Sequence, residues 1–113
     1  MRNEIIAYAK AFWKSGGKGP QVDVTHVVEK YIKMGDSYET AKEILLKNGF
    51  SVREYSIEEA AKRKDVRLTS RIVAETLIEG SWWDEKNIQI FLGDSPQSER
   101  VDSILAKVNY KTI

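Results

Sequence analysis

The sequence predicts an α+β fold in which N-terminal helices pack on one face of a three- to four-stranded antiparallel sheet. Two observations lead to this prediction. Apolar residues recur at helical spacing from the N-terminus to about residue 48, and alternate with polar residues over most of the remainder. The helical and extended parts are segregated along the chain, which is typical of α+β proteins and not of α/β proteins.

The amino-acid composition limits the classes of protein to which this chain can belong. The 113 residues are enough for one domain with a single core, and the fractions of 42% apolar and 31% charged residues are those of a folded chain. A formal net charge of +1 provides no overall field that would attract nucleic acid or an acidic membrane. The chain contains no cysteine, so disulfides, thiolate catalysis and cysteine-bound metal are excluded.

We expect a single domain over residues 1–113, made of an N-terminal part (1–20) and a helical pair with a sheet (21–113). A helix is predicted over residues 3–14, because its apolar residues share one face. These residues are Ile5, Ile6, Ala9, Phe12 and Trp13. Residues 15–20 hold three glycines and a proline and are predicted to form a flexible linker, which would make this helix a loosely attached arm.

A second helix is predicted to begin at Asp23 or Thr25, either of which can cap it, and to end at Gly35. Its apolar residues follow helical spacing in spite of their β-branching. They are Val24, Val27, Val28, Tyr31 and Ile32.

The third helix has both ends marked. Asp36 is predicted to cap its start, with Glu39 three residues later completing a capping box. Tyr38, Ala41, Ile44 and Leu45 share one face of this helix. Gly49 is the residue expected just past the end, where glycine takes up a left-handed backbone without strain.

From Phe50 onward, apolar residues stand at every second position instead of at helical spacing. Phe50 starts a half-buried strand, and Val52 faces the same way. Ser56 and Glu59 form a second possible capping box before a short helical turn. Val66–Glu79 is open to two interpretations. As a helix it would carry a stripe of Ile72, Val73, Thr76 and Leu77. As a strand it would align Val66, Leu68, Ser70, Ile72, Ala74, Thr76 and Ile78, and its β-branched residues favour this interpretation.

The C-terminal part is predicted to be a hairpin. Gly80–Asn87 is predicted to be a loop that carries two tryptophans, and Ile88–Leu92 alternates as a strand. After a cluster of turn-forming residues at Gly93–Arg100, the chain returns as a strand over Ile104–Tyr110, the expected partner of Ile88–Leu92. The lysines and asparagine of this last strand predict one solvated face.

One segment of the chain is similar to a known group of proteins. Tyr31–Ala41, with a glycine before the helix, and Leu45–Phe50, with its terminal Gly-Phe, resemble small bacterial proteins of the BamE-like and β-lactamase-inhibitor-protein-like group. Val101–Ile113 fits the last strand of such proteins. The resemblance covers roughly residues 24–113 as an architecture. It implies helices packed on a curved sheet, a bacterial source, and a role as a binding protein or inhibitor instead of an enzyme; the lipobox cysteine of relatives with an outer-membrane role is absent.

Trp82, Trp83, Asp84 and Glu85 are the residues that we predict to bind a partner protein. Adjacent residues at a strand end point in opposite directions, so only one of the two tryptophans can enter the core. The other would be exposed beside two carboxylates, and exposed tryptophan is enriched at binding hot spots. The alternative is that the second ring is covered by the N-terminal helix through Phe12 or Trp13, and we weigh the two equally.

Other candidate sites have weaker support. His26 is the single histidine, and its neighbours in the predicted helix supply no catalytic partner and no further metal ligand. Lys62–Lys64, with Arg67 and Arg71, is more simply a solvated helix end than a nucleic-acid surface. The carboxylates are scattered and no pair is singled out by its spacing. We therefore expect a protein partner, and no cofactor, metal or nucleic-acid ligand.

The leading hypothesis is a non-enzymatic protein-binding protein, such as an inhibitor or an immunity-type partner of a toxin or enzyme. The alternatives are an envelope or periplasmic accessory protein, and a small hydrolase or nuclease that uses His26 with a carboxylate and a lysine. No stretch is apolar enough to span a bilayer. The expected compartment is the cytoplasm if Met1 is the native start, and the periplasm or envelope if an export signal has been removed.

Overall fold

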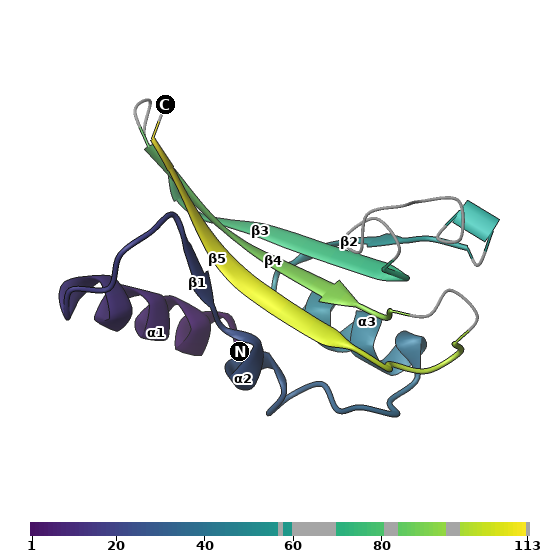
Figure 1. Ribbon diagram of the computed structural model, residues 1–113. Coiled ribbons are helices and arrows are strands. Elements are labelled where there is room, and N and C mark those ends of the chain that lie inside the picture. The colour runs from purple at the N-terminus through teal and green to yellow at the C-terminus, as the bar shows by residue number, and fades with distance from the viewer. Residues whose placement is uncertain (57, 60–69, 81–83, 95–97, 113) are drawn as a thin grey trace.

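The computed structural model describes residues 1–56, 58–59, 70–80, 84–94 and 98–112, and it confirms the predicted α+β class (Figure 1). Three helices and five strands make up this part of the chain. In chain order they are α1 (Arg2–Lys14), β1 (Gln21–Asp23), α2 (Thr25–Val28), α3 (Tyr38–Lys47), β2 (Ser51–Glu54), β3 (Ile72–Gly80), β4 (Asp84–Leu92) and β5 (Ile104–Thr112).

The strands form one antiparallel sheet in the order β1-β5-β4-β3-β2. The predicted hairpin of β4 and β5 is confirmed, with Ile88 opposite Val108 and Ile90 opposite Ala106. The edge strand β1 was not predicted. Only its central residue, Val22, is buried, and an element of three residues is too short to show a period of two.

The sheet is curved and the three helices lie along one side of it (Figure 1). The core fills the space between these two layers, with every second residue of the central strands pointing toward the helices. The fully buried large side chains include Ile5, Ile32, Leu45, Ile72, Ile88, Ile90 and Leu92. This arrangement leaves the opposite face of the sheet without cover from α1, α2 or α3.

Helix α1 is part of the core, so the expectation of a loosely attached arm is wrong. The side chains of Ile5 and Ala9 are buried, and Ile6, Phe12 and Trp13 pack against the same cluster, as the periodicity predicted. The free energy gained by burying this apolar face exceeds the conformational entropy that the glycine-rich linker loses. The face packs on the sheet because the apolar residues of α1 are shielded from water there.

Helix α2 is much shorter than predicted, although its buried residues are the expected ones. Thr25–Val28 is helical, and the chain then continues as turns in which Ile32 is still fully buried. The Asp23 carboxylate accepts a hydrogen bond from the Thr25 backbone N–H at 2.8 Å, which fixes the bend between β1 and α2. The Thr25 hydroxyl accepts one from the Ala106 N–H at 2.9 Å and ties α2 to β5.

Helix α3 has the predicted span and a different cap. Ser37 is the N-cap, and its hydroxyl accepts the Thr40 N–H at 3.1 Å. Asp36 instead accepts the Lys33 N–H at 2.9 Å and closes the preceding turn, so the predicted box of Asp36 with Glu39 is wrong. Gly49 has a φ of +82° just past the helix, as predicted.

Strand β2 begins at Ser51, next to the buried Phe50, as expected. The second capping box is present in full: the Glu59 N–H donates to the Ser56 hydroxyl at 3.2 Å, and the Ser56 N–H donates to the Glu59 carboxylate at 3.3 Å. The helical turn predicted after it falls largely outside the described residues.

The strand interpretation of Val66–Glu79 is confirmed from Ile72 onward, with Ile72 and Ala74 buried; residues 66–69 lie outside the described residues. The predicted loop over Gly80–Asn87 is too long, because β4 already begins at Asp84. Residues 84–87 pair with residues 109–112 of β5, and this backbone pairing extends the hairpin four residues beyond the apolar alternation that marked the strand in the sequence.

Candidate functional site

The candidate site is the face of the sheet opposite the helices. Residues directly across from one another in neighbouring strands point to the same face, so the pairing identifies its members. One row crosses all five strands: Asp23, Lys107, Gln89, Glu75 and Ser51. With strands spaced about 4.8 Å apart, this row is about 19 Å long.

A hydrogen-bonded ladder of amides lies along this face. The Asn109 side-chain NH₂ donates to Asn87 at 2.9 Å and to Gln89 at 2.7 Å. Both of these amides then donate to the Glu75 carboxylate, each at 3.4 Å. The ladder therefore runs across β5, β4 and β3 in one direction and ends on a carboxylate.

Lys107 departs from the prediction of a solvated face, since its side chain is only 6% exposed. Its ammonium nitrogen lies 5.8 Å from the centroid of the Phe91 ring, which is itself buried on this face. The alkyl stem of a lysine can cover apolar surface while the ammonium group lies near a ring, and this contact accounts for part of the burial of Lys107.

Two hollows flank the ladder. The larger, of about 490 Å³, lies over β2 and β3 and is lined by Glu75 together with Arg53, Tyr55 and Leu77 among others. The second, of about 370 Å³, lies over β1 and β5 and is lined by Gln21, Asp23, Leu105 and Lys107. The cross-strand row thus connects one hollow to the other.

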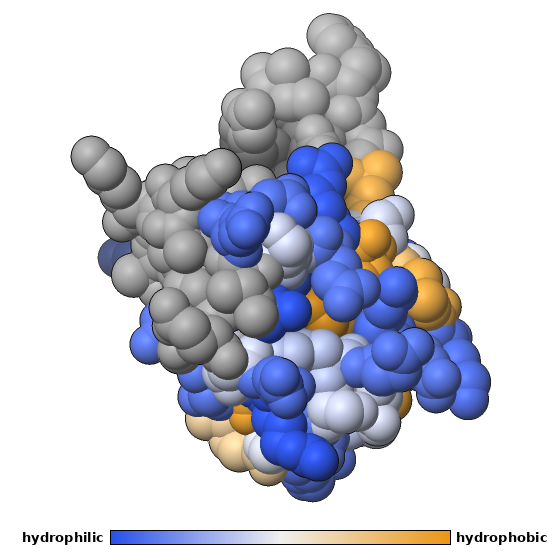
Figure 2. Space-filling model, turned by 90° about the vertical axis from the view of Figure 1, so that its right-hand side faces the viewer, coloured by the Kyte–Doolittle hydropathy of each residue, from blue (hydrophilic) through white to orange (hydrophobic). Residues whose placement is uncertain are grey.

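Apolar residues on the surface are few and separated. Leu77 and Leu105 are 53% and 36% exposed, one beside each hollow. Figure 2 views the molecule from the right-hand side of Figure 1, and the coloured surface on that side is mainly hydrophilic with a few orange patches. Such a surface fits a hydrogen-bonded, wet interface better than a large apolar one.

Two of the four binding residues predicted from the sequence, Asp84 and Glu85, lie at one end of this sheet. Trp82 and Trp83 are outside the described residues. Asp84 and Glu85 start β4, where they pair with Thr112 and Lys111 of β5. This backbone pairing places Asp84 and Glu85 at the hairpin end of the sheet, and the predicted binding site as a whole stays a prediction.

Comparison with protein-family models, with curated proteins and with solved structures finds no match for this chain. Function must therefore be inferred from the residues themselves.

His26 is exposed and packs edge-on against Tyr8, with ring centroids 4.5 Å apart. Within the described ranges, no three His, Asp or Glu side chains are grouped so as to hold a metal ion. No described helix is long and apolar enough to cross a membrane. The surroundings of His26 thus supply a packing contact and lend no support to the hydrolase alternative.

Of the basic cluster predicted around residues 62–71, only Arg71 belongs to the described part of the chain. It donates to the backbone carbonyls of Tyr55 at 2.9 Å and Ser98 at 2.8 Å, and its guanidinium group lies 5.1 Å from the centroid of the Tyr38 ring. Arg71 therefore joins the end of the sheet to α3, and this internal role explains its presence without a nucleic-acid ligand.

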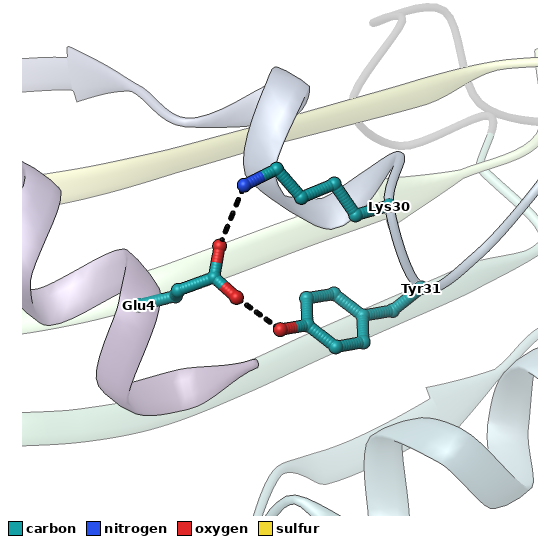
Figure 3. A network of polar contacts seen from close by, with 3 residues as sticks. All are labelled: Glu4, Lys30 and Tyr31. Atoms are coloured by element: carbon teal, nitrogen blue, oxygen red, sulfur yellow. Dashed lines mark hydrogen bonds and ion pairs between the residues drawn. The ribbon is translucent and has the colours of Figure 1, made fainter.

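A polar network joins α1 to the segment after α2 (Figure 3). The Glu4 carboxylate accepts hydrogen bonds from the Tyr31 hydroxyl and from the Lys30 ammonium group, the latter at 2.9 Å. The hydrogen bond from Tyr31, followed by that from Lys30, lowers the pKa of Glu4. The same contacts with Glu4 raise the pKa of Tyr31 and of Lys30.

This network predicts a pH-dependent stability with a definite sign. Because the folded-state pKa of Glu4 lies below the ordinary value of 4.5, its contribution is complete above that pH and is lost as the pH falls through the folded-state pKa. We expect Glu4→Gln to be less stable than the wild type at pH 7, with the difference shrinking in acid. Urea unfolding at several pH values measures this, and Glu43→Gln on the exposed side of α3 is the control. A difference that stays constant down to pH 2.5 would contradict it.

Proposed function

We propose that this protein is a non-enzymatic binding protein that docks a partner protein on the open face of its sheet. The observation that supports the proposal most strongly is the amide ladder between two hollows. Asn and Gln side chains that are already held by one another lose little conformational freedom on binding, so the remaining donors and acceptors of Asn87 and Gln89 are preorganised for a polar partner.

Glu75 defines the chemistry of that partner. Its carboxylate ends the ladder and lines the larger hollow, and it forms no ion pair with any residue in the described part of the chain. A guanidinium or ammonium group of a partner would form a charge-assisted hydrogen bond here, stronger than a bond between neutral groups. We infer that the docked surface is polar and places a basic side chain against Glu75.

The test is capture of a partner from the native source with matched variants. Glu75→Lys reverses the charge at the end of the ladder, and Glu43→Lys makes the same change on the exposed side of α3, away from the face. We expect the wild type and Glu43→Lys to retain the same protein, and Glu75→Lys to bind it at least about tenfold more weakly. If the captured protein is a toxin or an enzyme, adding the wild type is expected to lower its activity.

Three further variants examine the hairpin end and the enzymatic alternative. At least one of Trp82→Ala and Trp83→Ala is expected to weaken capture by about 2 kcal/mol or more, as for a hot-spot residue. His26→Ala is expected to leave capture unchanged. Equal retention of the partner by the wild type, Glu75→Lys and both tryptophan variants would overturn the proposed docking surface.

A further inference from the structure

A separate pocket lies on the other side of the sheet, between α1 and the hairpin end. It has a volume of about 320 Å³ and is lined by Lys10 and Trp13 of α1 and by Lys86 and Tyr110 of β4 and β5. Lys86 and Tyr110 are directly opposite each other in the sheet and share the helix-facing side with Ile88 and Val108. The pocket therefore lies between α1 and the sheet, just beyond the last buried residues of the core.

Two aromatic rings line this pocket at an angle. The centroids of Trp13 and Tyr110 are 6.1 Å apart and their planes are inclined by 60°. The Trp13 indole N–H donates to the Gly19 carbonyl at 3.3 Å, so this ring is held by the linker after α1. At this distance the two rings are in tilted contact, and together they form one aromatic wall of the pocket.

Two lysines supply the charge. The Lys86 ammonium nitrogen is 5.4 Å from the centroid of the Tyr110 ring, and Lys10 lies on α1 one turn before Trp13. Among the described residues, the four that line the pocket include no acidic side chain.

We propose that this pocket binds a small aromatic anion, a single ring that bears a carboxylate or a phosphate. The rings would stack against the apolar body of the ligand and the two ammonium groups would bind its charge. The volume is at the lower end of the range for ligand pockets and suits one ring. This site is on the opposite side of the sheet from the proposed docking face and does not depend on it.

The test follows the indole N–H signal of Trp13 by ¹H–¹⁵N NMR, assigned with Trp13→Phe. Benzoate and phenyl phosphate are the ligands, benzyl alcohol is the neutral ring, and inorganic phosphate is the anion without a ring. We expect saturable shifts of this signal with benzoate or phenyl phosphate, and binding of the other two compounds at least about tenfold weaker. Equal binding of benzyl alcohol, equal binding of inorganic phosphate, or no shift with either ligand would overturn the proposal.

Charge variants distinguish the pocket from nonspecific attraction to a basic surface. Lys10→Gln and Lys86→Gln are each expected to weaken binding of the preferred ligand about three- to tenfold, while Lys14→Gln on the same helix leaves it unchanged. Lys86→Arg keeps the charge and is expected to retain binding, which guards against a folding defect at this position. A loss of the same size in Lys14→Gln would assign the binding to the general charge of the surface and reject the pocket.

Discussion

Leu45→Ala is expected to lower the free energy of unfolding by about 2–5 kcal/mol. Leu45 is fully buried on the side of α3 that faces the sheet, together with Tyr38 and Ala41. Removing its isobutyl group leaves a cavity between the two layers. Alanine is as good a helix former as leucine, so the loss measures packing and not the stability of the helix itself.

The neighbouring residue provides the matched control. Leu46 is on the same helix and is 52% exposed, so Leu46→Ala is expected to change stability by about 0.5 kcal/mol at most. Urea unfolding followed by far-UV circular dichroism compares the three proteins directly. Equal losses for the two substitutions would mean that α3 does not pack on the sheet as described.

The contrast between these two leucines is also an example of what could be predicted from the sequence. Helical spacing placed Leu45, and not Leu46, on the buried face, because the period of an amphipathic helix depends on the residues of that helix alone. The same is true of β4, where Ile88, Ile90 and Leu92 alternate and are buried. The buried face was predicted correctly for elements whose hydrophobic pattern depends only on their own residues.

The caps and the short elements depended on contacts that are distant in sequence. Asp36 and Ser37 are both good capping residues, and the choice between them follows from hydrogen bonds to the loop before β5. The Gly35 N–H donates to the Val101 carbonyl at 2.8 Å, and the Arg100 guanidinium donates to the Gly35 carbonyl at 2.9 Å. These bonds position the turn so that Ser37 begins the helix.

For the candidate site, the sequence could predict the polar character of the residues but not their arrangement. The lysines and Asn109 of the last strand indicated a solvated face, but a ladder requires the pairing of strands, and a slip of one residue would turn the side chain of Asn109 into the core. The aromatic pocket likewise requires the placement of α1 against the sheet. Trp13 was identified as a packing residue, and nothing local to it indicates that it faces Tyr110.

Gly93→Ala is expected to destabilise the protein by about 2–4 kcal/mol for two separable reasons. Gly93 directly follows β4 and has a φ of +93°, a conformation that costs an alanine about 1–2 kcal/mol. In addition, a β-carbon at this position would lie well inside van der Waals contact of the Tyr38 hydroxyl group. Gly49→Ala isolates the first contribution, because Gly49 has a φ of +82° and open space where the β-carbon would be placed.

Tyr38→Phe isolates the second contribution. The Tyr38 hydroxyl is buried and no group in the described part of the chain lies in good hydrogen-bond geometry to it; burial raises its pKa, and the nearby Ser98 side chain opposes that shift. Removal of the hydroxyl alone is expected to be neutral or slightly stabilising. In the Gly93→Ala protein the same removal should restore about 1 kcal/mol or more, whereas in Gly49→Ala it should restore nothing. Chemical unfolding of the double-mutant cycle measures this coupling, and its absence would show that the contact between α3 and the end of β4 is not the one described.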